Sequence, residues 1–539
     1  MMDEICEAAT AGVEYGAAKI FVGPLFVQLM FSIRNASYNY SRTFCATRKR
    51  DFVVRRVNWP HGSGFVSSIS LELSQAAFLA AFIVFVAMSN RHHLTRSERL
   101  WSLDRAVPRY TSYPTAPHFE ATVGAELYAS WLDILTASDS LSLYLHVPFC
   151  ENLCLYCGCH TKAVRRFAPI ETYADLLVRE IDLVVARTGS HCISHLHWGG
   201  GTPSILGPNL LRKLAAQLDV RFDLASLRQH AIELDPRFVT KGLAEALADI
   251  GVTRASLGVQ DLSDHVQRAI GRIQPFHMVE RAVDLLRDVG IEQINIDLMY
   301  GLPSQSVQDV CRTVAQVHKL KPQRFAVFGY AHVPWFKPHQ KLIDESTLPA
   351  QPMRIAQACA AHKMLTELGY TPIGLDHYAD KTDSLTDALH AGKLRRNFQG
   401  YTTDDADALI GLGVSAIGDL SRGYVQNAPD IGSYSRAITA GQLATTRGIV
   451  LSDDDRIRGR IISELMCNLT CDLNSFVHDA DLTFANEIDA LSPLVADGLL
   501  RIEGHRIVVE EDGRLYLRLI AAAFDTYLHN SRARHSVGV

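Results

Sequence analysis

The chain has 539 residues, of which 47% are hydrophobic and 21% are charged, and its formal net charge is −5. This composition excludes a largely disordered chain, and the lack of a positive excess argues against nucleic acid as a partner. The length predicts about three domains, so we expect a folded, multidomain protein whose partners are small molecules.

Residues 1–87 form an atypical N-terminal extension that differs in character from the rest of the chain. Asp3 and Glu4 stand where a secretory signal peptide would be basic. The apolar run at residues 76–88 is shorter than the about 18 residues that a membrane-spanning helix needs. We therefore expect no membrane partner. We also hypothesise that translation begins at or near Met88, which an N-terminal mass measurement would test, and that residues 88–140 form an N-terminal arm.

Four cysteines follow the strand-like run at residues 141–145, namely Cys150, Cys154, Cys157 and Cys159. Thiolate is a preferred ligand of iron–sulfur clusters and of zinc. The first three cysteines can converge on one cluster, whereas a structural zinc site would use all four. The spacing favours the cluster, because zinc ligands usually come as two separated Cys-x2-Cys pairs. Free thiols beside a cluster loop imply a reducing compartment, for which the cytoplasm is the default expectation.

Between residues 141 and 345 the sequence alternates strand-like and helix-like segments. The predicted strands lie at residues 141–145, 194–198, 231–234, 255–259, 293–299 and 324–330. Gly251 and Gly290 end helical patterns, and Ser306 with Asp309 makes a capping box at the start of another. Six such units predict an α/β fold with an incomplete parallel (β/α)6 barrel, whose mouth should hold the functional site.

Polar residues and glycines stand at the ends of the predicted strands. Three consecutive glycines at residues 199–201 let the backbone approach a ligand closely. Carboxylates and amides that follow later strands have oxygens able to accept hydrogen bonds from ribose hydroxyls or an adenine amine, and a salt-bridged barrel rim is the alternative. These residues are Glu233, Asp235, Gln260, Asp261, Asn295 and Asp297. The nearby histidines at 160, 195 and 197 are interpreted as packed residues without a chemical role.

Residues 346–539 are predicted to form a mostly helical C-terminal domain with a winged-helix-like end. A hairpin is predicted at residues 499–510, with its turn at Gly504 and His505. The hairpin alternates charge instead of presenting a basic face, so we expect no nucleic acid there. We interpret this end of the chain as a lid over the barrel mouth.

Several strings of this sequence resemble known families. The Cys-x3-Cys-x2-Cys loop, with Tyr156 before its third cysteine, resembles the radical S-adenosylmethionine (SAM) superfamily. From residue 108 onward the chain is similar to the narrower family of bacterial oxygen-independent coproporphyrinogen III oxidases, also called dehydrogenases. The matching strings, besides the cysteine loop, lie at residues 108–115, 197–203, 258–261, 295–298, 330–332, 396–403 and 413–417. The first hundred or so residues have no counterpart.

The resemblance implies a radical SAM barrel in which Cys150, Cys154 and Cys157 ligate one 4Fe-4S cluster and Cys159 does not. It also implies two SAM molecules, one on the open iron of the cluster and a second beside it. The residues implied for the first are Tyr144, Gly200, Glu233 and Ile417, and those implied for the second are Tyr156, Gly201, Thr202, Gln260, Arg272, Asp297 and Ala331.

The activity that the resemblance implies is the oxidative decarboxylation of two propionate side chains of coproporphyrinogen III to vinyl groups. The product is protoporphyrinogen IX, in porphyrin and haem biosynthesis. A 5'-deoxyadenosyl radical from SAM would remove hydrogen from the propionate β-carbon, and CO2 would leave. An unidentified acceptor would take the remaining electron, and an unidentified donor would reduce the cluster. Neither step needs a general base, so we predict no catalytic side chain, and we expect a monomer.

A substrate with four carboxylates requires basic partners. We predict contacts from Arg109 and from the group Lys393, Arg395 and Arg396, for which a solvated charge run is an equal alternative. The nearest rival function is a haem chaperone built on the same barrel, and the remote one is a zinc-stapled interaction protein. Cys159 and the string at residues 108–115 both favour the oxidase.

Overall fold

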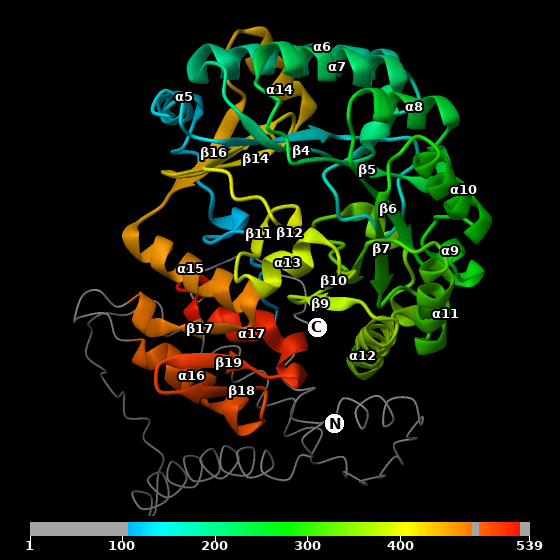
Figure 1. Cartoon of the computed structure of the whole chain (residues 1–539), viewed down its shortest axis with the longest axis vertical. Helices are drawn as coiled ribbons and strands as arrows, with labels where there is room; N and C mark the ends of the chain where they lie inside the picture. Colours follow the sequence, from blue (N-terminus) through cyan, green and yellow to red (C-terminus); the bar gives the residue numbers. More distant parts are fainter. Residues whose placement is uncertain (1–105, 477–483, 529–539) are drawn as a thin grey trace, which may run out of the picture. The chain divides into compact units, whose positions relative to one another are not determined.

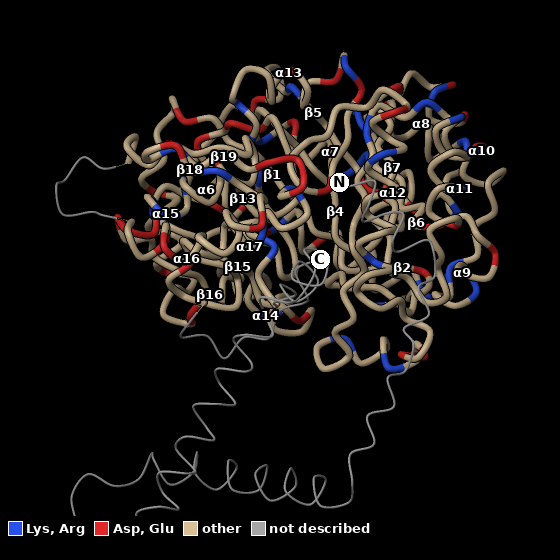
Figure 2. The backbone as a smooth tube through the Cα atoms, turned by 90° about the horizontal axis from the view of Figure 1, so that it is seen from below, with Lys and Arg blue, Asp and Glu red and all other residues tan. Residues whose placement is uncertain are grey.

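The computed structural model describes residues 106–476 and 484–528. Figure 1 shows a large sheet flanked by helices and, below it, a smaller C-terminal subdomain. Basic and acidic residues are interspersed along this part of the chain (Figure 2). No helix in these ranges is both long and apolar enough to cross a membrane. The hypotheses on the extension at residues 1–87, on the apolar run and on Met88 lie outside the described residues.

In the described part of the chain, seven parallel strands form the centre of the large sheet, in the order β13, β1, β4, β5, β6, β7, β8. The six predicted strands are confirmed as β1 (Leu141–Val147), β4 (Ile193–Gly200), β5 (Gln229–Leu234), β6 (Arg254–Gln260), β7 (Gln293–Tyr300) and β8 (Arg324–Gly329). The sheet is open, because its edge strands do not pair with each other. The α/β fold with an incomplete parallel barrel is therefore confirmed.

Helices connect these strands along the outside of the sheet (Figure 1). They are α6 (Ala168–Thr188), α7 (Gly207–Arg221), α8 (Lys241–Asp249), α9 (Asp264–Ala269), α10 (Phe276–Arg287) and α11 (Val307–His318). The predicted capping box begins α11, where Ser306 and Asp309 each accept a hydrogen bond from the other's backbone N–H. Gly251 and Gly290 follow α8 and α10 with φ of 78° and 89°, a conformation that costs glycine least. Apolar helix faces pack on the strands and leave the carboxyl strand ends for the site.

The large sheet continues beyond residue 345, which the sequence analysis did not foresee. Its further strands are β9 (Thr371–Ile373), β10 (His377–Ala379), β13 (Ala408–Leu412), β14 (Ile417–Leu420), β15 (Gly423–Asn427) and β16 (Thr445–Val450). Helix α12 (Gln351–Glu367) precedes β9. Between the further strands lie the helices α13 (Ser384–His390) and α14 (Ile431–Thr439) and the hairpin β11 (Arg395–Asn397) and β12 (Gly400–Thr402). These strands have three to six residues, too few for an alternating pattern to distinguish them from loops or helices.

The C-terminal subdomain has a second hydrophobic core. It consists of α15 (Asp453–Asn468), β17 (Thr470–Asp472), α16 (Ala485–Ala496), β18 (Leu500–Glu503), β19 (Arg506–Val509) and α17 (Leu517–Ala521). The predicted hairpin is confirmed as β18 and β19, with Gly504 in its turn at φ 64°. Tyr110 and Tyr113, near the start of the described chain, are buried in this core, and the Tyr110 hydroxyl donates to Asp525 at 3.0 Å. The two ends of the described chain are therefore packed together.

The loop that carries the cysteines leaves β1 and lies over the carboxyl ends of the strands. Its two ends pair as the short strands β2 (Phe149–Cys150) and β3 (Lys162–Ala163). Helix α5 (Ala125–Leu132) precedes β1 and packs its buried Trp131 and Leu132 in the large core. This arrangement presents the cysteine loop to the barrel mouth.

Candidate active site

The carboxyl ends of the parallel strands and the cysteine loop surround a cavity of about 580 Å³. Most residues that the sequence analysis proposed line it, and its fourth cysteine, Cys159, does so too. The predicted residues in the lining are Cys150, Cys154, Tyr156, Cys157, Gly200, Gly201, Thr202, Glu233, Gln260, Arg272, Asp297 and Ala331. Positions scattered over the barrel sequence thus meet in one place, as the strand ends of a barrel require.

Tyr144 and Ile417, proposed with that group, do not line the cavity. The Tyr144 hydroxyl is 3.0 Å from Nδ1 of His146, and its ring stacks on that of His197 with centroids 5.8 Å apart. A Cβ at Gly199 would lie 2.9 Å from the Tyr144 ring, so Tyr144 supports the glycine string from behind. Ile417 is the first residue of β14, and its backbone packs against β13.

Hydrogen-bond donors point at the cysteine sulfur atoms. The Thr202 hydroxyl donates to Cys150 Sγ at 3.4 Å, and Arg272 Nη1 donates to Cys154 Sγ at 3.5 Å. A hydrogen bond from Cys159 lowers the pKa of Cys157 to about 7, whereas burial raises the pKa of Cys150. Such donors favour the thiolate, which is the form of cysteine that ligates metals.

Three of the loop cysteines line the cavity together. Within residues 106–476 and 484–528, no three cysteine, histidine or acidic side chains are grouped so that they could hold one metal ion. Cys150, Cys154 and Cys157 all line the cavity, and an O–H and an N–H donate to the sulfur atoms of Cys150 and Cys154. Hydrogen bonds to sulfur and a cysteine-lined wall are what an iron–sulfur cluster requires of a protein.

The glycine string forms the part of the lining where no side chain fits. Gly200 has φ 109°, and a Cβ there would lie 2.6 Å from the His146 ring. At Gly201 a Cβ would lie 2.5 Å from the Phe149 carbonyl oxygen. Glycine is therefore required at both positions, and the backbone itself is exposed to a ligand.

Two strand-end acids are held in their charged form. Burial opposes ionisation of Glu233, but hydrogen bonds from His197 at 3.3 Å and from the Gly200 N–H at 3.1 Å outweigh it and lower its pKa. Asp235 is buried as well, and ion pairs with Arg237 at 2.6 Å and Arg272 at 2.9 Å lower its pKa. His197 therefore positions Glu233, which is consistent with a packed role for this histidine.

The remaining strand-end residues divide into lining and supporting positions. Asp261 and Asn295 do not line the cavity. The Asp261 carboxylate accepts hydrogen bonds from the Ser263 N–H and from Gln305, and so braces the loop after β6. Asn295 donates to Asp297 at 2.8 Å, which leaves Asp297 facing the cavity.

Asp297→Asn is expected to stabilise the ligand-free protein near pH 8. Burial, and then the charge of Glu233, raise the pKa of Asp297 from 3.8 to about 6. The folded state binds this proton more tightly than the unfolded state does, so stability is lost as the pH rises from about 4 to about 6. Because the side chain is only half-buried and cavity water screens it, we expect a gain on the order of 1 kcal/mol. Chemical denaturation near pH 4 and pH 8 measures the free energy of unfolding of wild type and of Asp297→Asn. An equal fall in both proteins between the two pH values would contradict the prediction.

A smaller pocket adjoins the cavity and shares Arg109, Phe328, Tyr330 and Ala331 with it. Of the basic residues proposed as propionate contacts, Arg109 and Arg396 line this pocket, whereas Lys393 and Arg395 do not. Arg354 of α12 and Arg518 of α17 also line it. Neither was predicted from the sequence, because each is a basic residue on a helix with no motif around it.

Comparisons with known proteins agree with this geometry. A model of the radical SAM superfamily matches residues 144–317, and a model of the HemN C-terminal domain matches residues 451–516. The chain is 48% identical over 440 residues to the oxygen-independent coproporphyrinogen III oxidase of Bradyrhizobium diazoefficiens, which covers 81% of this chain and 98% of that protein. It is 39% identical over 437 residues to the oxygen-independent coproporphyrinogen III oxidase of Pseudomonas aeruginosa, with 79% and 94% covered.

A solved structure supports the same assignment. The coproporphyrinogen III oxidase HemN from Escherichia coli, a radical SAM enzyme, superposes with a TM-score of 0.74 at 36% identity. The match covers 79% of this chain and 100% of that one. Membership of the superfamily implies a 4Fe-4S cluster and SAM, and it disfavours the zinc alternative. The chain belongs to the family of oxygen-independent coproporphyrinogen III oxidases within the radical SAM superfamily.

Proposed function

We propose that this protein converts two propionate side chains of coproporphyrinogen III to vinyl groups without oxygen and so makes protoporphyrinogen IX. The observation that carries the proposal is that three cysteines, two glycines and ionised strand-end acids line one cavity. An arginine-lined pocket next to that cavity suits the carboxylates of the substrate.

The bound cofactors would supply the radical, and residues of the chain would bind and orient the reacting groups. When bound, a 4Fe-4S cluster reduced by an external donor and SAM would supply a 5'-deoxyadenosyl radical for hydrogen abstraction from the propionate, with CO2 released and one electron passed to a separate acceptor. Cys150, Cys154 and Cys157 would hold the cluster. Glu233 and Asp297 would accept hydrogen bonds from hydroxyl or amine groups of SAM. The strand ends and the cysteine loop that surround the cavity would hold the reacting atoms together.

One anaerobic assay tests this function. Reconstituted protein, SAM, a low-potential reductant and coproporphyrinogen III are incubated, and the porphyrins are separated after oxidation. We expect a dipropionate, divinyl product that depends on SAM and on reductant. Tight haem binding without any decarboxylation would overturn the proposal in favour of the haem chaperone.

Two SAM molecules per chain are part of the proposal. Gly200 and Glu233 would contact the first. Those that would contact the second are Tyr156, Gly201, Thr202, Gln260, Arg272, Asp297 and Ala331. Gln260 lines the cavity with φ 69°, a conformation that costs a non-glycine residue about 1 to 3 kcal/mol and that is concentrated at functional sites.

Gln260→Ala is therefore expected to reduce SAM binding from two molecules per chain to one. The side chain amide that faces the second site is lost, while the cysteine wall and Glu233 are unchanged. Anaerobic equilibrium dialysis with labelled SAM measures the stoichiometry, and Gln399→Ala, a change outside this lining, serves as the control. A single SAM per wild-type chain would contradict the two-site proposal.

We further propose that the protein works as a monomer in the cytoplasm, with a small-molecule substrate and with a separate electron donor and acceptor. The support is chemical, since thiols that hold an iron–sulfur cluster persist in a reducing compartment. Size-exclusion chromatography with light scattering tests the monomer, and a stable dimer would contradict it.

A further inference from the structure

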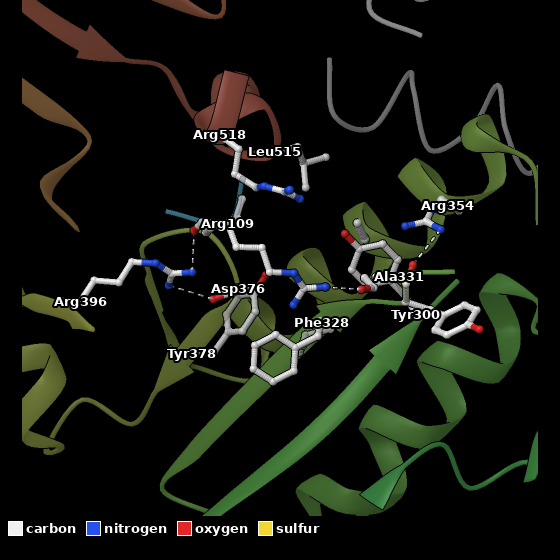
Figure 3. Close-up of a pocket in the computed structure, with 15 residues that line it drawn as sticks. Arg109, Tyr300, Phe328, Ala331, Arg354, Asp376, Tyr378, Arg396, Leu515 and Arg518 are labelled. Atoms are coloured by element: carbon white, nitrogen blue, oxygen red, sulfur yellow. Dashed lines mark hydrogen bonds and ion pairs between the residues drawn. The ribbon is translucent and has the colours of Figure 1, made fainter. Parts of the chain in front are cut away.

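The small pocket lined by Arg109, Arg354, Arg396 and Arg518 concentrates positive charge, and we name it the arginine pocket (Figure 3). Among the described residues, its lining contains four guanidinium groups and one carboxylate, that of Asp376. Its volume of about 50 Å³ is room for about three or four water molecules. The pocket is thus large enough for a carboxylate group and too small for a macrocycle.

The single acid in the arginine pocket is already engaged. Burial opposes ionisation of Asp376, but a hydrogen bond with His377 at 2.7 Å and the charge of Arg396 lower its pKa to about 2. Arg396 Nη1 lies 3.8 Å from the Asp376 carboxylate. Asp376 is therefore a fixed anion that balances one of the four positive charges.

The arginines mostly donate to neutral backbone carbonyls. Arg109 donates to Gly329 O at 3.2 Å, Arg354 donates to Tyr330 O at 3.0 Å, and Arg396 donates to Arg109 O at 3.3 Å. The Nε of Arg354 and the Nε of Arg396 are buried without a hydrogen bond. Buried donors without acceptors are costly, and an anion that accepted from one of them would reduce that cost.

Mutual repulsion of the arginines supports the same conclusion. The pKa of Arg109 is lowered by burial and, further, by Arg396 and Arg354, while Asp376 opposes the shift. Burial and Arg109 lower the pKa of Arg518 to about 10. A bound carboxylate would accept from these groups and offset their repulsion.

We propose that the arginine pocket binds one propionate carboxylate of coproporphyrinogen III, a carboxylate that does not react, and thereby orients the macrocycle in the adjoining cavity. This inference rests on the proposed function. Phe328, Tyr330 and Ala331 line both spaces, so a propionate arm can enter the arginine pocket while the ring system stays in the larger cavity. None of the described residues that line the arginine pocket is a cysteine, so a carboxylate there would lie apart from the cysteines beside which the radical would form.

The amino-acid end of SAM is the other carboxylate in the reaction, and it suits the pocket less well. It carries an ammonium group next to its carboxylate, and four guanidinium groups would repel that ammonium. A propionate brings its negative charge on an apolar two-carbon arm without any positive group. The charge of the pocket therefore favours the substrate over SAM.

The arginine pocket is assembled from segments that are far apart in the sequence. Arg354 lies on α12, Arg396 on β11 and Arg518 on α17, as Figure 3 shows. Arg518 also donates to the backbone carbonyls of Val107 and Pro108, and so holds the segment that carries Arg109. Arg354 donates to the Tyr330 carbonyl, whereas Arg396 and Arg518 donate to the segment that carries Arg109, so Arg354 is the position to test.

The experiment compares Arg354→Met and Arg354→Lys with wild type in the anaerobic assay. We expect KM for coproporphyrinogen III to rise about 10- to 100-fold in Arg354→Met, with a smaller rise in Arg354→Lys, which keeps the charge and loses the bidentate geometry. The change should fall on KM more than on kcat, because the contact is made in the ground state and in the transition state alike. SAM affinity and iron content should stay as in wild type.

The matched control is Arg187→Met, because Arg187 is an exposed arginine of α6 that pairs with Asp133 on the surface. It should leave KM unchanged. Arg109→Met carries the same expectation as Arg354→Met, so a folding defect at one position leaves the other as a test.

An unchanged KM in both arginine variants, together with normal turnover by wild type, would overturn the inference. A loss of SAM affinity with an unchanged porphyrin KM would overturn it too, because SAM would then occupy the pocket. Absence of product from wild type would instead count against the proposed function itself, and it would be seen before any variant is made.

Discussion

Cys154→Ser is expected to abolish iron binding and turnover together. Cys154 is 6% exposed, and its sulfur accepts from Arg272 at 3.5 Å and from Arg237 at 3.8 Å. A serine hydroxyl is a poor ligand for the iron of a cluster, which prefers thiolate. Iron and acid-labile sulfide per chain, measured after anaerobic reconstitution, should fall to background, and the porphyrin product should disappear.

Two serine variants serve as controls for that result. Cys159→Ser should keep its iron, because Cys159 is proposed to lie beside the cluster without ligating it. Cys192→Ser changes a cysteine that precedes β4 and lies outside the cavity lining, and it should leave both iron and product unchanged. A site that uses all four loop cysteines would instead lose its metal in Cys159→Ser, and full iron in Cys154→Ser would contradict the account.

Arg272→Met should be the most damaging change among the residues that are not cysteines. Arg272 is 6% exposed and donates to Asp235 at 2.9 Å, to the Gly258 carbonyl at 2.6 Å and to Cys154 Sγ. It thereby connects the ends of β5 and β6 to the cysteine loop. Removing one member of a buried ion pair typically costs about 3 to 5 kcal/mol, and Arg237, which still pairs with Asp235, should hold the loss near the lower figure.

The same change should misplace Cys154 and its neighbours. A displacement of reacting groups by about 1 Å can lower a rate about 100-fold, so we expect SAM cleavage to fall by at least that factor. Denaturation of the cluster-free protein measures the stability, and single-turnover formation of 5'-deoxyadenosine measures the chemistry. Arg212→Met, which breaks an exposed pair with Asp249, should cost less than about 1 kcal/mol. An equal loss of unfolding free energy in Arg272→Met and Arg212→Met would contradict the prediction that Arg272 stabilises the site.

The barrel could be predicted because its strands are buried. In β1, six of seven residues are buried, so the strand appears in the sequence as a nearly continuous apolar run. The location of the site could be predicted from the parallel order of the strands. Parallel strands bring residues such as Glu233 and Asp297 to one edge of the sheet, whatever their separation in the sequence. The cysteine loop was visible because its ligands lie within a few residues of each other.

Other features depend on contacts between distant segments, which no local pattern records. Strand β13 pairs in parallel with β1, which lies far from it in the sequence. Its five buried residues are too few for the sequence to distinguish a strand from a helix. The arginine pocket is of the same kind, because Arg518 reaches Pro108 across 410 positions. Tyr144 illustrates a different limit, because the residue was noticed but its packing behind Gly199 depends on the backbone geometry there.

The central claim is that Cys150, Cys154 and Cys157 hold a 4Fe-4S cluster with one iron left open for SAM. Low-temperature electron paramagnetic resonance of the anaerobically reduced protein, recorded with and without SAM, tests it most directly. We predict the signal of a reduced 4Fe-4S cluster whose g-values change when SAM is added, and no such signal in Cys154→Ser. A spectrum that SAM leaves unchanged, or a colourless protein with stoichiometric zinc, would contradict the claim.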